Sequence, residues 1–160
     1  LKNLKELGFQ TGAGFMVGSP YQTLEDIAKD LFFIQELKPQ MVGIGPFIPH
    51  SQTEFSNFPQ GDLDLTLFIL SLVRIMNPKV LLPGTTALST INPEGRILGI
   101  LSGANVVMPN VSPMEQRKNY SLYNNKVSEN EESVEGLALL QKQLDKINCK
   151  IDYSRGDYQI

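Results

Sequence analysis

The chain has 160 residues, of which 41% are hydrophobic, and a formal net charge of −3 at pH 7. This length suffices for one domain with a sizeable core, or for part of a larger domain. The charge gives no basic footprint for nucleic acid, and the apolar runs are far shorter than the ~18 residues of a membrane span. The single cysteine, Cys149, excludes an internal disulfide framework and a multi-cysteine metal site, and favours a reducing, cytoplasmic setting.

The first residues read as the inside of a helix. Leu1, Leu4 and Leu7 have helical spacing, and Gly8 is a helix stop. Neither an initiator methionine nor a capping residue precedes them. The sequence therefore leads us to expect a fragment, the C-terminal part of a longer protein.

Four units that each read apolar run, turn and amphipathic segment follow in series. The predicted strands start near residues 11, 41, 80 and 105, and the predicted helices cover 24–37, 62–76, about 92–102 and 114–123. Thr23 and Asp26 have the spacing of a capping box, and Asn92 with Pro93 supplies an N-cap followed by a first-turn proline. Residues 85–91 are predicted to be a loop.

Serial units of this kind indicate parallel strands joined by crossover helices, and nearly continuous apolar strands indicate a sheet covered on both faces. No glycine-rich phosphate fingerprint separates a strand from its helix. Half of a (β/α)8 barrel and a doubly wound sheet both fit, and the missing front end favours the half barrel. Residues 1–123 form this α/β unit, and 124–160 are expected to be a polar loop, a covering helix and a C-terminal extension.

Ligands of parallel α/β sheets meet the loops after the carboxyl ends of the strands. Here these loops are 18–21, 46–53, 84–90 and 109–112, and they hold glycines, prolines and hydroxyls with almost no acids or bases. His50 is the only histidine, and no nucleophile elbow or spaced metal ligands accompany it. The strand ends are therefore expected to bind a ligand whose reactive group comes from elsewhere.

Several residues near these ends have two interpretations. Thr85 and Thr86 either donate hydroxyls and backbone N–H groups to an anion or only cap their loop. Met108 either packs a strand end or faces a cavity. Tyr120 and Tyr123, three apart, share a helix face that either packs in the core or reaches the ligand.

Four sequence blocks resemble the HydE family, the radical S-adenosylmethionine (SAM) enzymes that mature FeFe-hydrogenase and belong to the biotin synthase-like group. The blocks are "GAGFMVGSPYQTLED", "GIGPFIPHSQT", "PGTTALSTINPEGR" and "GANVVMPNVSPMEQRKNYSLY". The resemblance implies a (β/α)8 barrel of TIM type, of which this chain supplies strands five to eight. It also implies SAM and a 4Fe-4S cluster, although the family's CxxxCxxC cluster loop is absent here.

The resemblance also assigns residues to the two ligands. For SAM these are Gly14, Gly18, Gly45, Phe47, Ile48 and Tyr120. For the substrate or anion cavity they are Thr85, Thr86, Met108, Asn110 and Tyr123. No catalytic residue or metal ligand is assigned within this chain, and His50 becomes a residue that shapes the loop next to SAM.

The activity implied is reductive cleavage of SAM to methionine and a 5′-deoxyadenosyl radical, which acts on an iron–carbonyl–cyanide–cysteine synthon for the hydrogenase H-cluster. Other maturases and an electron donor are the expected partners, with no nucleic acid or membrane. Because the cluster loop is missing, the chain alone is expected to be inactive. Biotin synthase-like or methylornithine synthase-like enzymes, and a non-catalytic half barrel, are the alternatives. The open strand edges of a half barrel are expected to pair with another chain.

Overall fold

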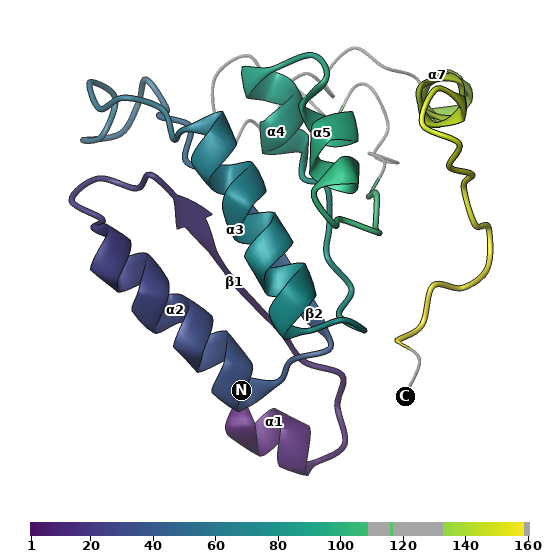
Figure 1. Cartoon of the computed structure of the whole chain (residues 1–160). Helices are drawn as coiled ribbons and strands as arrows, with labels where there is room; N and C mark the ends of the chain where they lie inside the picture. The colour runs from purple at the N-terminus through teal and green to yellow at the C-terminus, as the bar shows by residue number, and fades with distance from the viewer. Residues whose placement is uncertain (109–115, 117–132, 159–160) are drawn as a thin grey trace.

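The computed structural model of the chain describes residues 1–108, 116 and 133–158. Helices and strands alternate through most of this length, as Figure 1 shows. The elements are α1 (Lys2–Glu6), β1 (Gly12–Val17), α2 (Leu24–Leu37), β2 (Met41–Pro46), α3 (Leu63–Met76), α4 (Thr86–Ile91), α5 (Gly95–Leu101) and α7 (Ser133–Asp145).

The sheet is parallel and follows the order of the chain. β1 pairs with β2 in a register that runs from Gly12 opposite Met41 to Val17 opposite Pro46. Two further extended segments are joined by single parallel bridges, Met41 to Leu81 and Pro83 to Val106. The predicted parallel order is therefore confirmed.

The last two predicted strands are reduced to these bridges by a proline and by a side-chain contact between the two segments. Pro83 has no N–H to give to a ladder. The N–H of Leu82 donates to the side-chain oxygen of Asn105, at 2.8 Å, instead of to a strand carbonyl. The Gly84 N–H then donates to the Val106 carbonyl at 2.9 Å. The segments stay adjacent and parallel, but they lack the continuous pairing of a strand.

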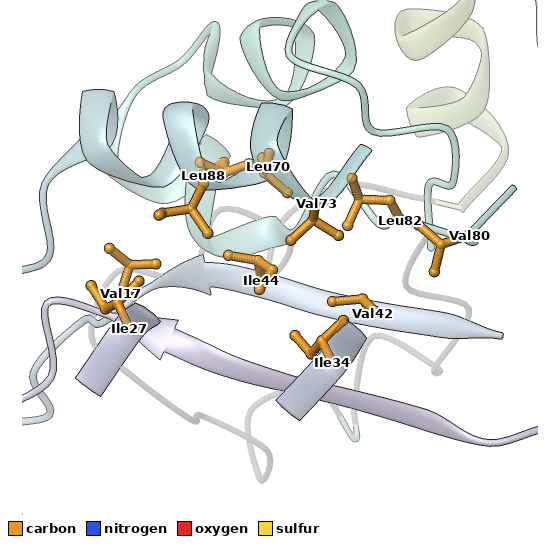
Figure 2. Close-up of a cluster of buried hydrophobic side chains, with 11 residues drawn as sticks. Val17, Ile27, Ile34, Val42, Ile44, Leu70, Val73, Val80, Leu82 and Leu88 are labelled. Carbon is orange, nitrogen blue, oxygen red and sulfur yellow. The ribbon is translucent and has the colours of Figure 1, made fainter. Parts of the chain in front are cut away.

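One face of the sheet packs against the helices. Val17, Val42 and Ile44 are fully buried on this face, and Ile27 and Ile34 of α2 lie against them, as Figure 2 shows. The rest of the cluster comes from α3 and the later segments, namely Ile69, Leu70, Val73, Val80, Leu82 and Leu88. Burying one such side chain contributes about 1.5–3 kcal/mol, so this cluster holds the helices on the sheet.

Helix α2 has a specific start and end. The Thr23 hydroxyl accepts from the Asp26 N–H, and the Asp26 carboxylate accepts from the Thr23 N–H, which confirms the predicted capping box. At the other end, the Lys5 ammonium of α1 donates to the carbonyls of Leu37 and Lys38, at 2.5 and 2.6 Å. A cation at a helix C-terminus is favourable, so the Lys5 ammonium of α1 stabilises the C-terminal end of α2.

The prediction of a loop at residues 85–91 is wrong, because α4 covers Thr86–Ile91. The predicted start of the next helix is also shifted: α5 begins at Gly95 with Glu94 as its N-cap. Asn92 instead ends α4, and its side-chain oxygen accepts from the Glu94 N–H at 2.8 Å. Asn92 thus still directs the turn into the helix, from two residues before the N-cap Glu94.

The C-terminal part contains the predicted helix, which ends at Asp145. Leu140 and Leu144 of α7 are buried, and Gln141 bonds back to the extended tail through the Ile151 N–H at 3.0 Å. The predicted boundary at residue 123 and nearly all of the predicted helix at 114–123 lie outside the described residues. In the described part of the chain, no helix has the length and apolarity needed to cross a membrane.

Candidate functional site

The second face of the sheet is nearly bare of side chains. Side chains alternate between the faces of a strand, so residues next to the buried Val17 and Ile44 point away from the helices. On β1 and β2 these positions are Gly12, Gly14, Met16, Met41, Gly43 and Gly45. Four of the six are glycine, and the three on β1 are exposed. This face therefore leaves room for another molecule or another part of the protein.

Gly45 and Thr85, both predicted as ligand contacts, lie together at the carboxyl edge of this face. The Thr85 hydroxyl oxygen is 2.8 Å from the point where a β-carbon on Gly45 would stand. Any side chain at position 45 would therefore displace Thr85.

Among the described residues, the buried Thr85 hydroxyl has no hydrogen-bond partner. Thr85 is the N-cap residue of α4, yet its side chain makes no capping hydrogen bond. Capping, the alternative to ligand binding, therefore does not account for this hydroxyl. An unpaired buried hydroxyl costs about 1–3 kcal/mol, so a partner from outside the described residues would stabilise it.

Phe47 and Ile48 follow β2 directly. The Phe47 N–H donates to the Val17 carbonyl, and the Gly61 N–H donates to the Phe47 carbonyl, both at 2.8 Å. The Phe47 side chain is buried and Ile48 is half-buried. The long loop to Gly61 is thus closed back onto the ends of both strands, which leaves Ile48 as the more accessible of the two side chains.

Gly14 and Gly18 are required by the packing of this chain itself. A β-carbon on Gly14 would overlap the Gly43 carbonyl of the neighbouring strand. Gly18 has a φ of 80°, and a β-carbon there would stand 2.6 Å from the Gly61 Cα. Their predicted contact with SAM stays a prediction, because close backbone approach already explains both glycines.

Gln22 is a residue of this region that the sequence did not single out. Its side-chain oxygen accepts from the N–H groups of Gly18 and Ser19, at 2.8 and 3.3 Å, and its amide donates to the Met16 carbonyl at 2.9 Å. The N–H groups of this turn are therefore already occupied and are not donors for an anion. A glutamine four residues after a strand-end glycine was the available signal.

An aromatic cluster joins the loops after β1 and β2. Phe58 stacks edge-to-face with Tyr21 and with Phe55, at centroid distances of 5.3 and 5.7 Å. Tyr21 is strongly exposed and has a φ of 65°, a left-handed conformation that costs energy for a residue with a side chain. The cluster fixes the two loops relative to each other beside the glycine face.

His50 is used within its own loop. Its Nδ1 accepts from the Gln52 N–H at 3.1 Å, and its carbonyl accepts from the Thr53 hydroxyl at 2.9 Å. These contacts give His50 a part in shaping the loop.

The remaining predicted residues lie farther along. Thr86 is the first residue of α4 and is half-buried. Met108 is exposed and lies two residues after the bridge at Val106, so it points to the same face as Val106. Asn110, Tyr120 and Tyr123 lie outside the described residues. Within residues 1–108, 116 and 133–158, no three His, Cys, Asp or Glu side chains gather in a way that could hold a metal ion.

Comparison with known proteins relates this site to a family. No protein-family model matches the chain. The [FeFe] hydrogenase maturase subunit HydE of Thermotoga maritima is 45% identical over 150 residues, which are 94% of this chain and 43% of that protein. The 3-methylornithine synthase of Methanosarcina barkeri is 26% identical over 132 residues, 82% of this chain and 35% of that protein.

Among solved structures, methylornithine synthase (PylB) superposes with a TM-score of 0.73 at 23% identity, over 94% of this chain and 43% of that one. At this identity the likeness concerns the fold, and it confirms the predicted partial barrel. The chain spans less than half the length of the relatives that it matches. On its sequence identity to HydE, the chain belongs to the HydE-type family of FeFe-hydrogenase maturases, within the radical SAM enzymes.

Proposed function

We propose that this chain supplies part of the catalytic barrel of a radical SAM maturase that acts in assembly of the FeFe-hydrogenase H-cluster. The observation that carries the proposal is the 45% identity to HydE over nearly the whole chain. The second face of the sheet, which is nearly bare of side chains, supports the proposal, because a barrel enzyme needs room inside the barrel for a cofactor and a substrate.

The residues present fit SAM but not the iron–sulfur cluster. A glycine face edged by an unpartnered hydroxyl leaves space for an adenosyl group and offers it one hydrogen bond. A 4Fe-4S cluster needs several thiolates, whereas this chain has one cysteine, Cys149. The cluster ligands would come from outside this sequence, as the family's CxxxCxxC loop implies.

When bound, SAM and the cluster supply a 5′-deoxyadenosyl radical by one-electron reduction, with release of methionine. The residues of this chain bind and orient. Gly45 leaves the space that the Thr85 side chain fills beside the sheet, and the Thr85 hydroxyl bonds the polar edge of the ligand. Phe47, held by backbone hydrogen bonds to Val17 at the end of β1 and to Gly61, stiffens the rim. The aromatic cluster of Tyr21, Phe55 and Phe58 limits the access of water from the side of these loops.

The substrate belongs to the proposal as well. An iron–carbonyl–cyanide–cysteine synthon is small and rich in hydrogen-bond acceptors, which suits hydroxyl donors better than charged bases. Other hydrogenase maturases and an electron donor are the partners that such a reaction requires. The single cysteine fits a reducing, cytoplasmic location.

A chimera tests the proposed function. The matching 150-residue segment of Thermotoga maritima HydE is replaced by this chain, and the chimera is supplied to cells that lack their own HydE. We expect mature, hydrogen-evolving FeFe-hydrogenase from these cells. A chimera that folds and binds its cluster but gives only immature hydrogenase would contradict the proposal.

A second candidate is a rearrangement like that of 3-methylornithine synthase, which the matches to this enzyme favour. The same chimera distinguishes the two functions. Formation of 3-methylornithine, without hydrogenase maturation, would favour this candidate.

A further inference from the structure

Helix α3 is apolar on its outward face as well as on the face that packs on the sheet. The inward residues Ile69, Leu70 and Val73 are buried in the core. Phe68 and Ile75 lie on the opposite side of the helix and are 58% and 74% exposed. A surface helix usually carries polar and charged residues on its outward face. The outward face of α3 is therefore suited to contact with another molecule.

Four residues form one apolar stripe along this face. Leu65 and Leu72 are half-buried and pack partly on the core, and Phe68 and Ile75 extend the stripe outward. The intervals between the four are three, four and three residues, the spacing with which one helix packs against another in a coiled coil. We call these four residues the α3 stripe. In Figure 1 α3 lies between α2 and α5, in front of the sheet.

The α3 stripe is complementary to itself. Its spacing of three, four and three residues reads the same in both directions of the helix. When two copies of α3 lie antiparallel and cross at their centres, Leu65 of each copy lies opposite Ile75 of the other, and Phe68 lies opposite Leu72. A two-fold contact of this kind uses the same patch on both copies. A second copy of the chain therefore offers an apolar partner to every residue of the stripe.

The charges at the two ends of α3 favour the same arrangement. Asp62 and Asp64 lie at its N-terminal end, and Arg74 and Lys79 lie at its C-terminal end. Asp64 and Lys79 are exposed, and the sequence has no charged residue between Asp64 and Arg74. Antiparallel copies bring the acidic end of each helix to the basic end of the other. Parallel copies would bring like charges together, which is unfavourable.

We propose that the α3 stripe is the interface of a symmetric dimer, in which α3 of one copy packs antiparallel to α3 of a second copy. A standard interface buries about 800 Å² of each partner, and four apolar side chains on one helix supply about half of this area. The dimer is therefore weak and forms at concentrations on the order of micromolar. This surface is separated from the glycine face by the sheet, so the inference does not depend on the proposed function.

Sedimentation velocity of the chimera with Thermotoga maritima HydE tests the dimer. In the chimera the remainder of the barrel supplies the strand beside β1, so the open edge of the sheet does not add to self-association. We expect the sedimentation coefficient to rise with concentration from that of a monomer to that of a dimer. Phe68→Glu places a carboxylate in the stripe and should raise the dissociation constant at least about 10-fold.

Tyr153→Glu is the matched control for Phe68→Glu. Tyr153 is an aromatic residue that is 77% exposed, and it lies in the C-terminal extension, away from α3. Its substitution should leave the dissociation constant of the dimer unchanged. The urea midpoint of Phe68→Glu should also stay close to that of the unaltered chimera, since Phe68 is not part of the core. This midpoint separates loss of the interface from loss of the fold.

A charge swap tests the antiparallel direction. Asp64→Lys and Lys79→Asp each place like charges where the two helices meet at their ends, and each should weaken the dimer by about 2- to 10-fold. The double variant should regain the affinity of the unaltered chimera, because opposite charges face each other again.

A dimer that Phe68→Glu dissociates and that the double charge swap restores supports the inference. A chimera that is monomeric at every concentration overturns it, and so does a dimer that Phe68→Glu leaves intact. A double swap that binds no better than its single variants contradicts the antiparallel arrangement. Formation of 5′-deoxyadenosine by the same chimera is measured separately, so loss of the dimer with retained SAM cleavage leaves the proposed function intact.

Discussion

At the scale of single residues, Thr85 carries a buried hydroxyl that bonds no group among the described residues. Thr85→Val keeps the shape and removes the unpaired group, so the free energy of unfolding should stay unchanged or rise by about 1 kcal/mol. The same substitution should weaken binding of an adenosyl ligand to the chimera, because the hydroxyl that bonds the ligand is lost. Urea unfolding measures the first effect and calorimetry the second.

Thr85→Ser is the matched control, because it keeps the hydroxyl and should keep ligand binding. Marked destabilisation by Thr85→Val would mean that the hydroxyl has a partner within the fold, and our account of it would be incorrect.

The glycines of the strand ends differ in a way that can be measured. Gly18 combines a φ of 80° with close approach to Gly61, whereas a β-carbon on Gly43 would meet nothing within 4 Å. Gly18→Ala should therefore lower the free energy of unfolding by about 1–3 kcal/mol, and Gly43→Ala should be tolerated. Equal effects in urea unfolding would show that backbone conformation does not explain Gly18.

At the scale of elements, the capping box of α2 gives stability that depends on pH. Hydrogen bonds from the Thr23 hydroxyl and N–H, in that order, lower the pKa of Asp26 below its usual 3.8. A lowered folded-state pKa means that its stabilisation is present above pH 3.8 and is lost as the pH falls through the folded-state value.

The stability difference between the wild type and Asp26→Ala should therefore be largest near pH 6 and shrink below pH 4. Thermal unfolding across this range measures it. Asp30→Ala, in the same helix but outside its first turn, is the control. A difference that stays constant down to pH 2.5 would rule out the proposed linkage.

Arg74 of α3 joins its helix to residues 78–80 and to Gly103. Its Nε donates to the Gly103 carbonyl at 2.8 Å, and its Nη1 donates to the carbonyls of Pro78 and Val80 at 2.8 and 3.0 Å. Arg74→Lys keeps the charge but cannot reach both sides of this fork. It should lower the free energy of unfolding by about 2 kcal/mol.

Arg155→Lys is the control for Arg74, since Arg155 is exposed and pairs only with Asp157 within the described residues. It should leave unfolding unchanged. If Arg74→Lys also left the free energy of unfolding unchanged, the hydrogen bonds from Arg74 to these carbonyls would not stabilise the fold.

The elements show which signals in the sequence carried information. The capping box of Thr23 and Asp26 and the apolar stripe of α2 are local, and both were predicted correctly. The loop that proved to be α4 has three threonines and a serine in seven residues, a composition that is ambiguous between turn and helix. The loss of two strands depended on the Asn105 side chain replacing a ladder bond, a contact between distant residues that no local pattern reveals.

The same difference between local signals and long-range contacts holds for the site. Gly45 and Thr85 were predicted as ligand residues, and the structure brings them together. Gln22 was missed because a glutamine four residues after a strand-end glycine is a weak signal, and its bonds to the turn become visible only in the folded geometry.

At the scale of the whole molecule, the sheet has an open edge. Among the described residues β1 pairs only with β2, so its outer edge has no neighbouring strand, although the Met16 carbonyl there accepts from the Gln22 amide. Such an edge invites pairing with another chain. We expect the isolated chain to have a mass above 17.8 kDa in light scattering at high concentration. A clean monomer throughout would contradict this expectation.

The central claim is that this chain is part of a radical SAM barrel and works only when joined to the rest of it. Anaerobic reconstitution with iron and sulfide, followed by measurement of 5′-deoxyadenosine formed from SAM, tests this most directly. We expect no cluster and no 5′-deoxyadenosine from the chain alone, and both from the chimera with Thermotoga maritima HydE. A stoichiometric cluster with SAM turnover in the isolated 160-residue chain would contradict the account.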